Sequence, residues 1–337
     1  MFSSYDEIYH LIKDDLNEMN KIRSKTIIKY ILGWISLFAS IIIPAIFGLS
    51  IPNAGIQWLA AFVFFFGTVA SIVSIFKTLG SFRMAFKRKV VKRLLKALFE
   101  SANLPEDDPN YEMKWGYATN GKIDNFLIGE SGLFYLNRID RVAGKDLIIG
   151  KIGSTAFYFS ELRLYKQVKS SGNERKNRKL IPRYQGVLYL ADFHKHFKGH
   201  TVLRDKQIFS FQHVKRFFRH HYHRMLSGKK LTTIKMENDE FNKYFKVRTT
   251  NEFEARYILS PNLMEDLVAF RKRNRNPIDI AFRKRFISLF LYNKKDYFEP
   301  SIYNSMKKQS KIAYDDLILF FRIINDLNLN TRIWSKE

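Results

Sequence analysis

The residues from Tyr30 to Phe76 contain no Asp, Glu, Lys, Arg or His, and this stretch constrains the fold more than any other feature. A transmembrane helix needs about 20 apolar residues to cross a hydrocarbon core that is roughly 30 Å thick. Residues 30–50 and 56–76 each supply such a run, and the residues between them include the turn formers Pro, Asn and Gly. Because neither run has the polar face of a helix in a soluble core, residues 30–76 predict a hairpin of two transmembrane helices.

Basic side chains flank the hairpin on both sides, and the connecting turn carries no charge. By the positive-inside rule, flanks rich in Lys and Arg stay in the cytoplasm. The sequence therefore predicts a multi-pass protein of the cytoplasmic (inner) membrane with both termini in the cytoplasm. The flanking residues are Lys21, Arg23, Lys25 and Lys29 before the hairpin, and Lys77, Arg83, Lys87, Arg88, Lys89, Lys92, Arg93 and Lys96 after it.

Residues 1–29 predict an amphipathic helix ahead of the hairpin. Its apolar side chains recur every three or four residues, and Ser4 and Glu7 have the spacing of a capping box. The favoured interpretation is a packing helix that leads into the first span, and the alternative is a helix that binds a partner. The apolar stripe consists of Tyr5, Ile8, Tyr9, Ile12, Leu16 and Met19.

Residues 81–101 predict a second amphipathic helix, on the other side of the hairpin. A basic juxtamembrane helix can lie on the anionic inner leaflet, or it can dock its apolar face on the following domain and leave the basic face in water. The two interpretations are compatible. The apolar face consists of Phe82, Phe86, Val90, Val91, Leu94, Leu95 and Leu98, and the candidate membrane-surface residues are Arg83, Lys87, Arg88, Lys89, Lys92, Arg93 and Lys96.

About 260 residues follow the hairpin, enough for one large or two small domains with buried cores. Turn-forming residues at 103–122 predict a boundary, and the order of elements beyond it predicts an α+β domain over 120–337 with a mostly antiparallel sheet. Helices are expected at 207–226, 261–273 and 309–328. Strands are expected at 126–128, 133–137, 146–152, 155–165, 184–193, 231–236 and 243–249, and two more at 277–292 around a basic turn.

The chain has a net charge of +25 at pH 7, and the excess lies after the hairpin. A basic domain tethered to a bilayer sits beside an anionic leaflet, where each basic residue contributes roughly 1 kcal/mol. Nucleic acid is a second polyanion that suits this charge and is the least favoured partner. A composition rich in Lys, Ile, Asn and Phe, as an AT-rich genome encodes, accounts for the same charge without a ligand. The absence of Cys excludes disulfides, thiolate chemistry and Cys-ligated zinc.

Most of the histidines cluster in residues 194–223, where imidazole could bind a metal or titrate. The segment has no HExxH spacing, and Lys and Arg surround the cluster, so a basic and partly titrating face is favoured over a metal site. We expect no metal and no cofactor. The clustered residues are His194, His196, His200, His213, His220, His221 and His223.

Two further patterns resemble functional motifs weakly. Residues 150–155 (GKIGST) lack the order of a phosphate-binding loop, and the next segment reads as a strand, so a turn between strands is favoured. Glu252, Glu254, Asp296 and Glu299 could supply an acid–base pair, although an ion pair of Glu254 with Arg256 is the simpler interpretation. No hydrolase, kinase or dinucleotide motif is present, and no catalytic residue is predicted.

Several phrases in the second half of the chain resemble a bacterial family of membrane proteins. They include DLIIGKIGSTAFYFSELRLY, RYQGVLYLADFHKHFKGHT, DEFNKYFKVRTTNEFEARYILSPNLMEDL and DYFEPSI, with LNLNTRIW near the end, and the resemblance covers about residues 120–337. The family is a domain of unknown function, number three-one-three-seven, and the resemblance implies two N-terminal spans and a cytoplasmic domain. It implies no activity, cofactor or catalytic residue. The basic turn at Arg283 to Arg285 departs from the family's less charged hairpin, which puts any role based on its charge in doubt.

Three functions fit these observations. The preferred hypothesis is a membrane-anchored cytoplasmic binding or scaffold domain that contacts the anionic leaflet or a protein partner, with a homo-oligomer as one such partner. The alternative is a membrane-tethered enzyme with an unrecognised site, which a deep pocket lined by perturbed carboxylates or histidines would favour. Nucleic-acid binding at the membrane is the third.

Overall fold

The computed structural model describes residues 3–50, 54–100, 114–134, 139–152, 155–169, 178–207, 231–274 and 276–326. The chain divides into two compact units. Unit 1 comprises Met1–Asn103 and Phe298–Leu317, and unit 2 comprises Leu104–Tyr297 and Ile318–Glu337.

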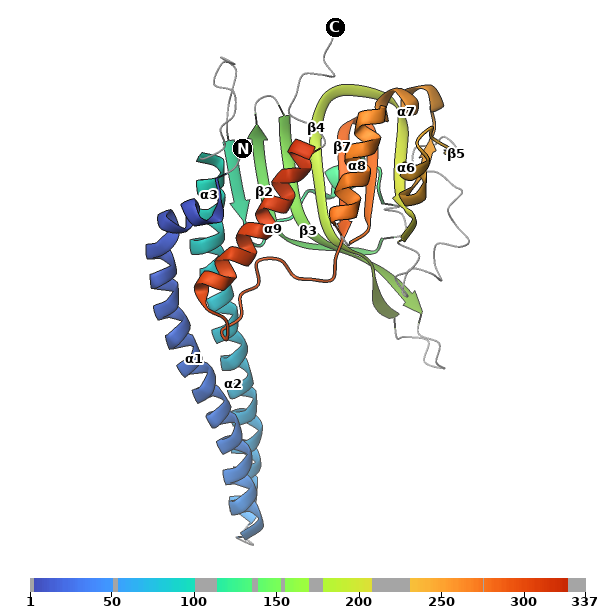
Figure 1. The fold of residues 1–337 in the computed structure, drawn as a ribbon. Coiled ribbons are helices and arrows are strands. Elements are labelled where there is room, and N and C mark those ends of the chain that lie inside the picture. The colour runs from blue at the N-terminus through green and yellow to red at the C-terminus, as the bar shows by residue number, and fades with distance from the viewer. Residues whose placement is uncertain are drawn as a thin grey trace. The chain divides into compact units, whose positions relative to one another are not determined.

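Unit 1 is built on two long helices, α1 (Tyr5–Ser50) and α2 (Ala54–Phe86), which run side by side in Figure 1. Small residues line their contact: the Ser36 and Ser71 hydroxyls lie 2.9 Å apart, and a Cβ built on Gly33 would lie 2.7 Å from Ile75 Cγ1. Small side chains let two helix backbones approach closely. Both helices contain a stretch long and apolar enough to cross a membrane, and most of each stretch is exposed. The predicted pair of apolar helices is confirmed, and the predicted turn at Pro52 and Asn53 lies outside the described residues.

The helix of α2 continues through a π-helical turn, η1 (Lys87–Val91), into α3 (Lys92–Glu100). All seven residues of the predicted apolar face at 81–101 are buried, and so are five residues of the predicted stripe in 1–29. The Tyr5 hydroxyl lies 2.7 Å from Ser310 Oγ, and the Tyr314 hydroxyl donates a 2.8 Å hydrogen bond to Ser3 O. The first turns of α9 (Met306–Asp326) therefore pack on the start of α1. The five buried stripe residues are Tyr5, Ile8, Ile12, Leu16 and Met19.

Unit 2 contains an antiparallel sheet with strand order β1-β2-β3-β4-β6-β5, and β7 also pairs with β4. The α+β class with a mostly antiparallel sheet is confirmed. The longest strand, β4, pairs with β3 through residues 178–191, with β6 through residues 201–205, and with β7 between residues 186 and 204. The strands of the described residues are β1 (Lys114–Ala118), β2 (Arg141–Ile152), β3 (Thr155–Lys169), β4 (Arg178–Asp205), β5 (Thr232–Ile234), β6 (Phe245–Thr249) and β7 (Ile278–Tyr292).

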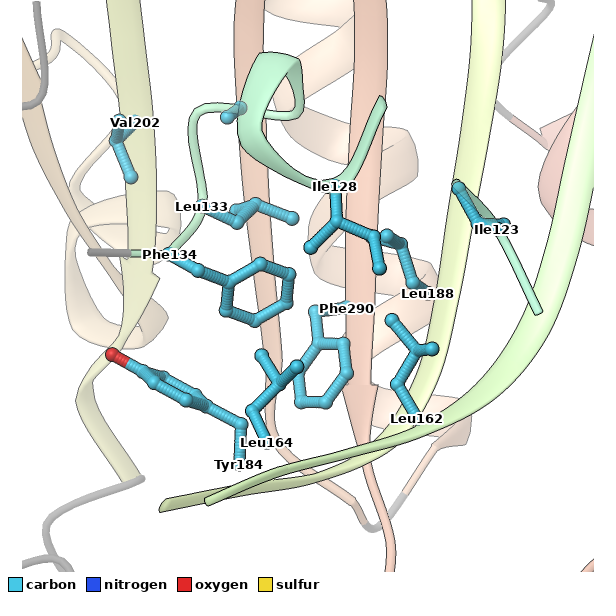
Figure 2. Packing of buried hydrophobic residues seen from close by; sticks show 11 residues of the cluster. Ile123, Ile128, Leu133, Phe134, Leu162, Leu164, Tyr184, Leu188, Val202 and Phe290 are labelled. Atoms are coloured by element: carbon cyan, nitrogen blue, oxygen red, sulfur yellow. The ribbon is translucent and has the colours of Figure 1, made fainter. Parts of the chain in front are cut away.

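One face of the sheet is covered by residues 123–134, which include the short helix α4 (Asn125–Glu130). Figure 2 shows Phe134 against Tyr184 and Phe290, with ring centroids 4.9 Å and 5.0 Å from the Phe134 ring. Aromatic pairs in edge-to-face contact contribute about 0.5–1.5 kcal/mol beyond the area they bury. The cluster joins Ile123, Ile128, Leu133, Phe134, Leu162, Leu164, Tyr184, Leu188, Val202, Ala281 and Phe290.

Three further helices begin in unit 2, and each follows a capping residue whose side chain accepts a hydrogen bond from a backbone N–H group in the first turn. Helix α8 (Pro261–Arg273) begins after Ser260 with Pro in its first turn, as predicted, because Pro suits the first helical position. On the sheet face opposite the cluster, Phe157 and Phe159 of β3 meet Tyr189 and Phe321. The other short helices are α6 (Asp239–Tyr244), capped by Asn238, and α7 (Glu252–Ile258), capped by Asn251.

Two element predictions are wrong. Residues 126–128 form part of α4 and not a strand, because Asp124 Oδ1 accepts a 2.7 Å hydrogen bond from Phe126 N and caps a helix. Residues 277–292 do not form two strands around a turn. They form the single strand β7, since the long β4 offers a partner along its length and the basic residue Lys284 takes a positive φ of 53° within the strand.

Of three further predicted elements, one is confirmed, one is partly wrong and one lies mostly outside the described residues. Ile152 pairs with Thr155, so residues 150–155 connect two antiparallel strands as expected. Leu133 and Phe134 are not in a strand, and residues 135–137 of that predicted strand lie outside the described residues. The predicted helix at 207–226 lies beyond the described residues from position 208.

Candidate functional site

The candidate membrane-surface residues lie along the end of α2, η1 and α3, and most of them contact carboxylates of unit 1. Lys87 is buried, and its Nζ lies 2.8 Å from Glu299 Oε1, while Arg83 Nε lies 3.6 Å from Glu299 Oε2. A carboxylate more than two hundred positions away along the chain therefore neutralises the first part of the basic segment. The sequence did not predict this pairing and offered Glu299 only as one possible member of an acid–base pair.

The rest of the segment divides into paired and unpaired groups. Lys89 pairs with Glu18 and Arg93 with Asp15, both on α1, and Lys96 pairs with Glu100 one turn ahead. Arg88 and Lys92 are exposed and contact no carboxylate of the described residues. Since the apolar face of this segment is buried, only its basic face is free to meet a leaflet, and that contact stays a prediction.

A second group of basic side chains lies nearer to the apolar stretches. Lys25, Lys29 and Lys77 are exposed, and no described carboxylate lies within ion-pair distance of their amines. The contacts of Gly33 with Ile75 and of Ser36 with Ser71 set the antiparallel register of α1 and α2. This register places Lys77 level with the start of the charge-free stretch on α1, so Lys29 and Lys77 lie at the same end of the apolar surface.

In unit 2, the structure brings together two carboxyl groups that the sequence did not connect. Glu161 of β3 and Asp296, which follows β7, share a hydrogen bond, and Tyr297 N donates a 3.1 Å bond to Glu161 Oε2. Lys145 Nζ lies 3.8 Å from Glu161 and 3.5 Å from Asp296, and Arg163 bonds Asp296 directly. Two cations and two carboxyls thus form one cluster at the edge of the aromatic face.

The two carboxyls of this cluster have opposite pKa shifts. Burial raises the pKa of Glu161 to about 7, Lys145 opposes this, and the bond with Asp296 adds to it. The pKa of Asp296 lies below its ordinary value because the bond with Glu161, Lys145 and Arg163 outweigh the effect of burial. One proton therefore resides on Glu161 and is donated to ionised Asp296. The cluster is internally satisfied, which indicates a role in holding the segment after β7.

The shift of Glu161 predicts a pH-dependent stability. The folded state keeps this proton up to a pH of about 7, whereas the unfolded chain releases it near the ordinary value of 4.5. The stabilisation is therefore complete below pH 4.5 and is lost as the pH rises through 7. We expect Glu161→Gln, which keeps the neutral form, to match the parent at pH 4 and to be about 1–2 kcal/mol more stable at pH 8, after allowance for solvent screening.

The measurement is urea unfolding of the full chain in detergent at the two pH values, followed by tryptophan fluorescence and circular dichroism. Glu252→Gln is the matched control, because Glu252 is exposed on α7 and bonds Arg256 on the same helix. Equal stabilities of Glu161→Gln and the parent at pH 8 would contradict the assignment of the proton to Glu161.

The structure does not form the carboxylate pairings that were considered from the sequence. Glu254 does not pair with Arg256; its two oxygens accept hydrogen bonds from Lys198 N at 2.8 Å and Gly199 N at 2.6 Å. Arg256 instead bonds Glu252 and Glu237. Two adjacent backbone N–H groups provide a better site for the Glu254 carboxylate than a guanidinium that two other acids already occupy. Asp296 and Glu299 lie in different units.

For His200, the predicted titrating face is wrong. The ring is buried, and its Nε2 lies 3.1 Å from Gly132 O, so this nitrogen donates, while Nδ1 has no hydrogen-bond partner among the described residues. Burial lowers the pKa of His200 to about 4, with Arg283 and Arg204 acting in the same direction. Gly132 has a φ of +68°, and a Cβ there would lie 2.6 Å from the ring.

Of the other clustered histidines, His196 is exposed. The side chain of His194 lies outside the description, and so do residues 208–230 with His213, His220, His221 and His223. Within the described parts of the chain, no group of three His, Asp or Glu residues is placed to hold a metal ion.

A buried network of two Arg–Asp pairs was missed by sequence reasoning. Arg204 bonds Asp279 and donates a 2.7 Å hydrogen bond to Leu133 O, and Arg271 bonds Asp205. The Asp279 carboxylate also accepts a 3.1 Å hydrogen bond from Asp205 N, and the Asp205 carboxylate accepts a 3.2 Å hydrogen bond from Ile278 N. The charges are therefore paired and hydrogen-bonded, as buried charges must be. The network joins the ends of β4, α8 and β7.

The basic residues in the middle of β7 also make contacts within unit 2. Arg283 Nη1 donates a 3.1 Å hydrogen bond to Gly129 O, Lys284 Nζ lies 2.6 Å from Glu130, and Arg285 bonds Asp192. These three side chains hold α4 and β4 against β7, so their charge has a structural explanation.

The match to a known family covers the part of the chain that contains this Arg–Asp network and the basic residues of β7. Residues 183–329 match the family described as "Protein of unknown function (DUF3137)". This is the family that the quoted phrases resemble, and the matched residues extend from within β4 to just beyond α9. No curated protein and no solved structure matches the chain. The family description assigns no activity, so function must be argued from the geometry.

Proposed function

We propose that this protein is a membrane-anchored binding protein. Its α1 and α2 cross the cytoplasmic membrane as a hairpin, both termini lie in the cytoplasm, and the basic residues beside the spans contact the anionic leaflet. The observation that carries the proposal is the exposed apolar surface of α1 and α2, which ends on one side only at exposed lysines that pair with no carboxylate of the described residues.

Distance from the apolar surface decides which lysines contribute most to the attraction for the anionic leaflet. The headgroup zone extends roughly 5–8 Å beyond the hydrocarbon core on each side, and charges interact with the leaflet over a Debye length of about 8 Å. At 1.5 Å per residue, Lys29 and Lys77 lie about 2 Å and Lys25 about 8 Å from the ends of the charge-free stretch. Three such residues contribute roughly 1 kcal/mol each to attraction for anionic lipid.

In this proposal, the basic face of η1 and α3 contributes less to the attraction for the anionic leaflet. Along a continuous helix, Arg88 lies about 18 Å and Lys96 about 30 Å beyond Phe76, which exceeds two Debye lengths. Ion pairs with Asp15, Glu18, Glu100 and Glu299 also offset part of the charge of this segment. The alternative of a tethered enzyme receives no support from the Glu161–Asp296 cluster, since its groups bind one another.

The test uses the tryptophans that stand near opposite ends of the hairpin. Trp34 lies near the basic ends of the helices and Trp58 near the charge-free turn. One chain retains only Trp34 and another only Trp58, with Phe at the other tryptophan positions, and both are placed in bilayers containing a brominated lipid. We expect brominated phosphatidylserine to quench Trp34 more than an equal fraction of brominated phosphatidylcholine does, and the two lipids to quench Trp58 equally.

Matched charge variants identify the responsible residues. Lys25→Gln, Lys29→Gln and Lys77→Gln together should lower the preference of Trp34 for the anionic quencher to the level seen at Trp58. The control, Arg88→Gln, Lys92→Gln and Lys96→Gln together, removes the same charge farther from the spans and should leave the preference unchanged. The reverse pattern would assign the leaflet contact to the α3 segment, and no quenching of either tryptophan would overturn membrane anchoring.

A further inference from the structure

The residues from Phe298 to the start of α9 belong to unit 1, together with α1 and α2. Its start is held by Glu299, which bonds Lys87 and Arg83. Farther along, Arg23 Nη1 donates a 2.7 Å hydrogen bond to Asn304 O. The chain from Glu299 to Asn304 therefore follows the helices toward the start of the apolar surface.

An exposed tyrosine stands at the end of this path. Tyr303 is 77% exposed, and its hydroxyl shares a hydrogen bond with that of Tyr30, the first residue of the charge-free stretch. Tyr30 in turn hydrogen-bonds Trp34, and the two rings meet edge to face with centroids 6.2 Å apart. Three aromatic side chains with polar tips thus line the boundary between the apolar helices and the basic residues.

We propose that Tyr303 is a membrane-interface anchor whose ring lies among the lipid headgroups beside Tyr30 and Trp34. The proposal rests on the proposed function, because it requires α1 and α2 to cross the bilayer. Tyrosine and tryptophan are enriched at this depth, where the ring is apolar and the hydroxyl or indole N–H stays wet. The level of Tyr30 matches that of Lys77 in the helix register, so a headgroup phosphate lies within reach of the same cluster.

Lipid suits this position better than a soluble ligand. Tyr303 is exposed beside Tyr30, where the charge-free stretch of α1 begins, and its hydroxyl is already bonded within the protein. The consequence is that a segment about 250 residues after the first span becomes part of the anchor, so the bilayer holds the start of α9 as well as the hairpin.

The experiment places the full chain in bilayers with one tryptophan as the probe. Tyr303→Trp is combined with Phe at the four native tryptophan positions, and lipids brominated near the headgroup end of the acyl chain are compared with lipids brominated near its terminus. We expect blue-shifted emission and stronger quenching by the shallow bromines than by the deep ones. Water-like emission without quenching by either lipid would overturn the proposal.

Two controls make the outcome specific. Tyr257→Trp in the same Trp-free background probes an exposed position on α7 in unit 2 and should be quenched by neither lipid. The chain that retains only Trp58 reports on the hairpin itself. Quenching of Trp58 without quenching of the Tyr303→Trp indole rejects the anchor and leaves the proposed function intact, whereas no quenching of either rejects both. Circular dichroism of Tyr303→Trp equal to that of the parent shows that the fold is retained.

Discussion

The Ala54→Cys variant should react with a membrane-impermeant maleimide added outside spheroplasts, whereas Ser81→Cys and Thr233→Cys should react only after lysis. Ala54 is exposed at the charge-free end of the hairpin, Ser81 lies beyond the second apolar run, and Thr233 is exposed on β5. The positive-inside rule keeps the flanks rich in Lys and Arg in the cytoplasm, so the difference should be nearly all-or-none. The measurement is the mass shift of the purified chain after labelling.

The background for this labelling is already suitable, because the sequence contains no Cys. Lysed spheroplasts provide the control that all three thiols are accessible. Labelling of Thr233→Cys from outside would contradict the proposed orientation. Recovery of the chain in the soluble fraction without detergent would contradict anchoring altogether.

The second large effect concerns the buried network of unit 2. Asp279→Ala should lower the free energy of unfolding of this unit by about 3–5 kcal/mol, because it leaves the buried Arg204 guanidinium without its charge partner. The Asp279 carboxylate also accepts a 2.7 Å hydrogen bond from the Tyr292 hydroxyl and one from Asp205 N. Urea unfolding in detergent, followed by circular dichroism, measures the change.

Two variants test whether the buried charge left unpaired causes the loss of stability. Asp239→Ala removes the same group from an exposed ion pair with Lys235 and should change the stability by at most about 1 kcal/mol. Replacing both partners, with Arg204→Met and Asp279→Leu, should recover most of the loss, since well-packed apolar residues often stabilise as much as a buried ion pair. A loss in the double variant equal to that of Asp279→Ala would show that shape, and not the unpaired charge, limits stability.

Local patterns in the sequence predicted much of the architecture. The apolar runs at 30–50 and 56–76, the stripe from Tyr5 to Met19 and the apolar face from Phe82 to Leu98 were each predicted from local patterns, and the structure confirms each of them as helical. The strand at 155–165 was likewise predicted from its alternation. Residues 126–128 were misassigned, since three apolar residues suit a helix or a strand and the Asp124 cap decided between them.

The candidate site was less accessible to sequence reasoning. The segment from Arg83 to Lys96 was identified as basic, yet its charge depends on partners such as Glu299, which lies 212 positions after Lys87. The carboxyl pair of Glu161 and Asp296 depends in the same way on the return of the chain after β7. A net charge records composition alone, whereas free charge depends on which carboxylates the fold brings near.

The sequence by itself determined that this protein has two long apolar helices, an amphipathic segment on each side of them and an α+β domain of mostly antiparallel strands. These properties follow from apolar residues spaced two to four positions apart and from apolar runs of about twenty residues. Both patterns can be read directly from the order of residues along the chain. Only the tertiary structure decided that Lys87 is neutralised, that Glu161 holds a proton and that Tyr303 stands beside Tyr30. Each of these depends on residues far apart in the chain, whose distance is set by packing.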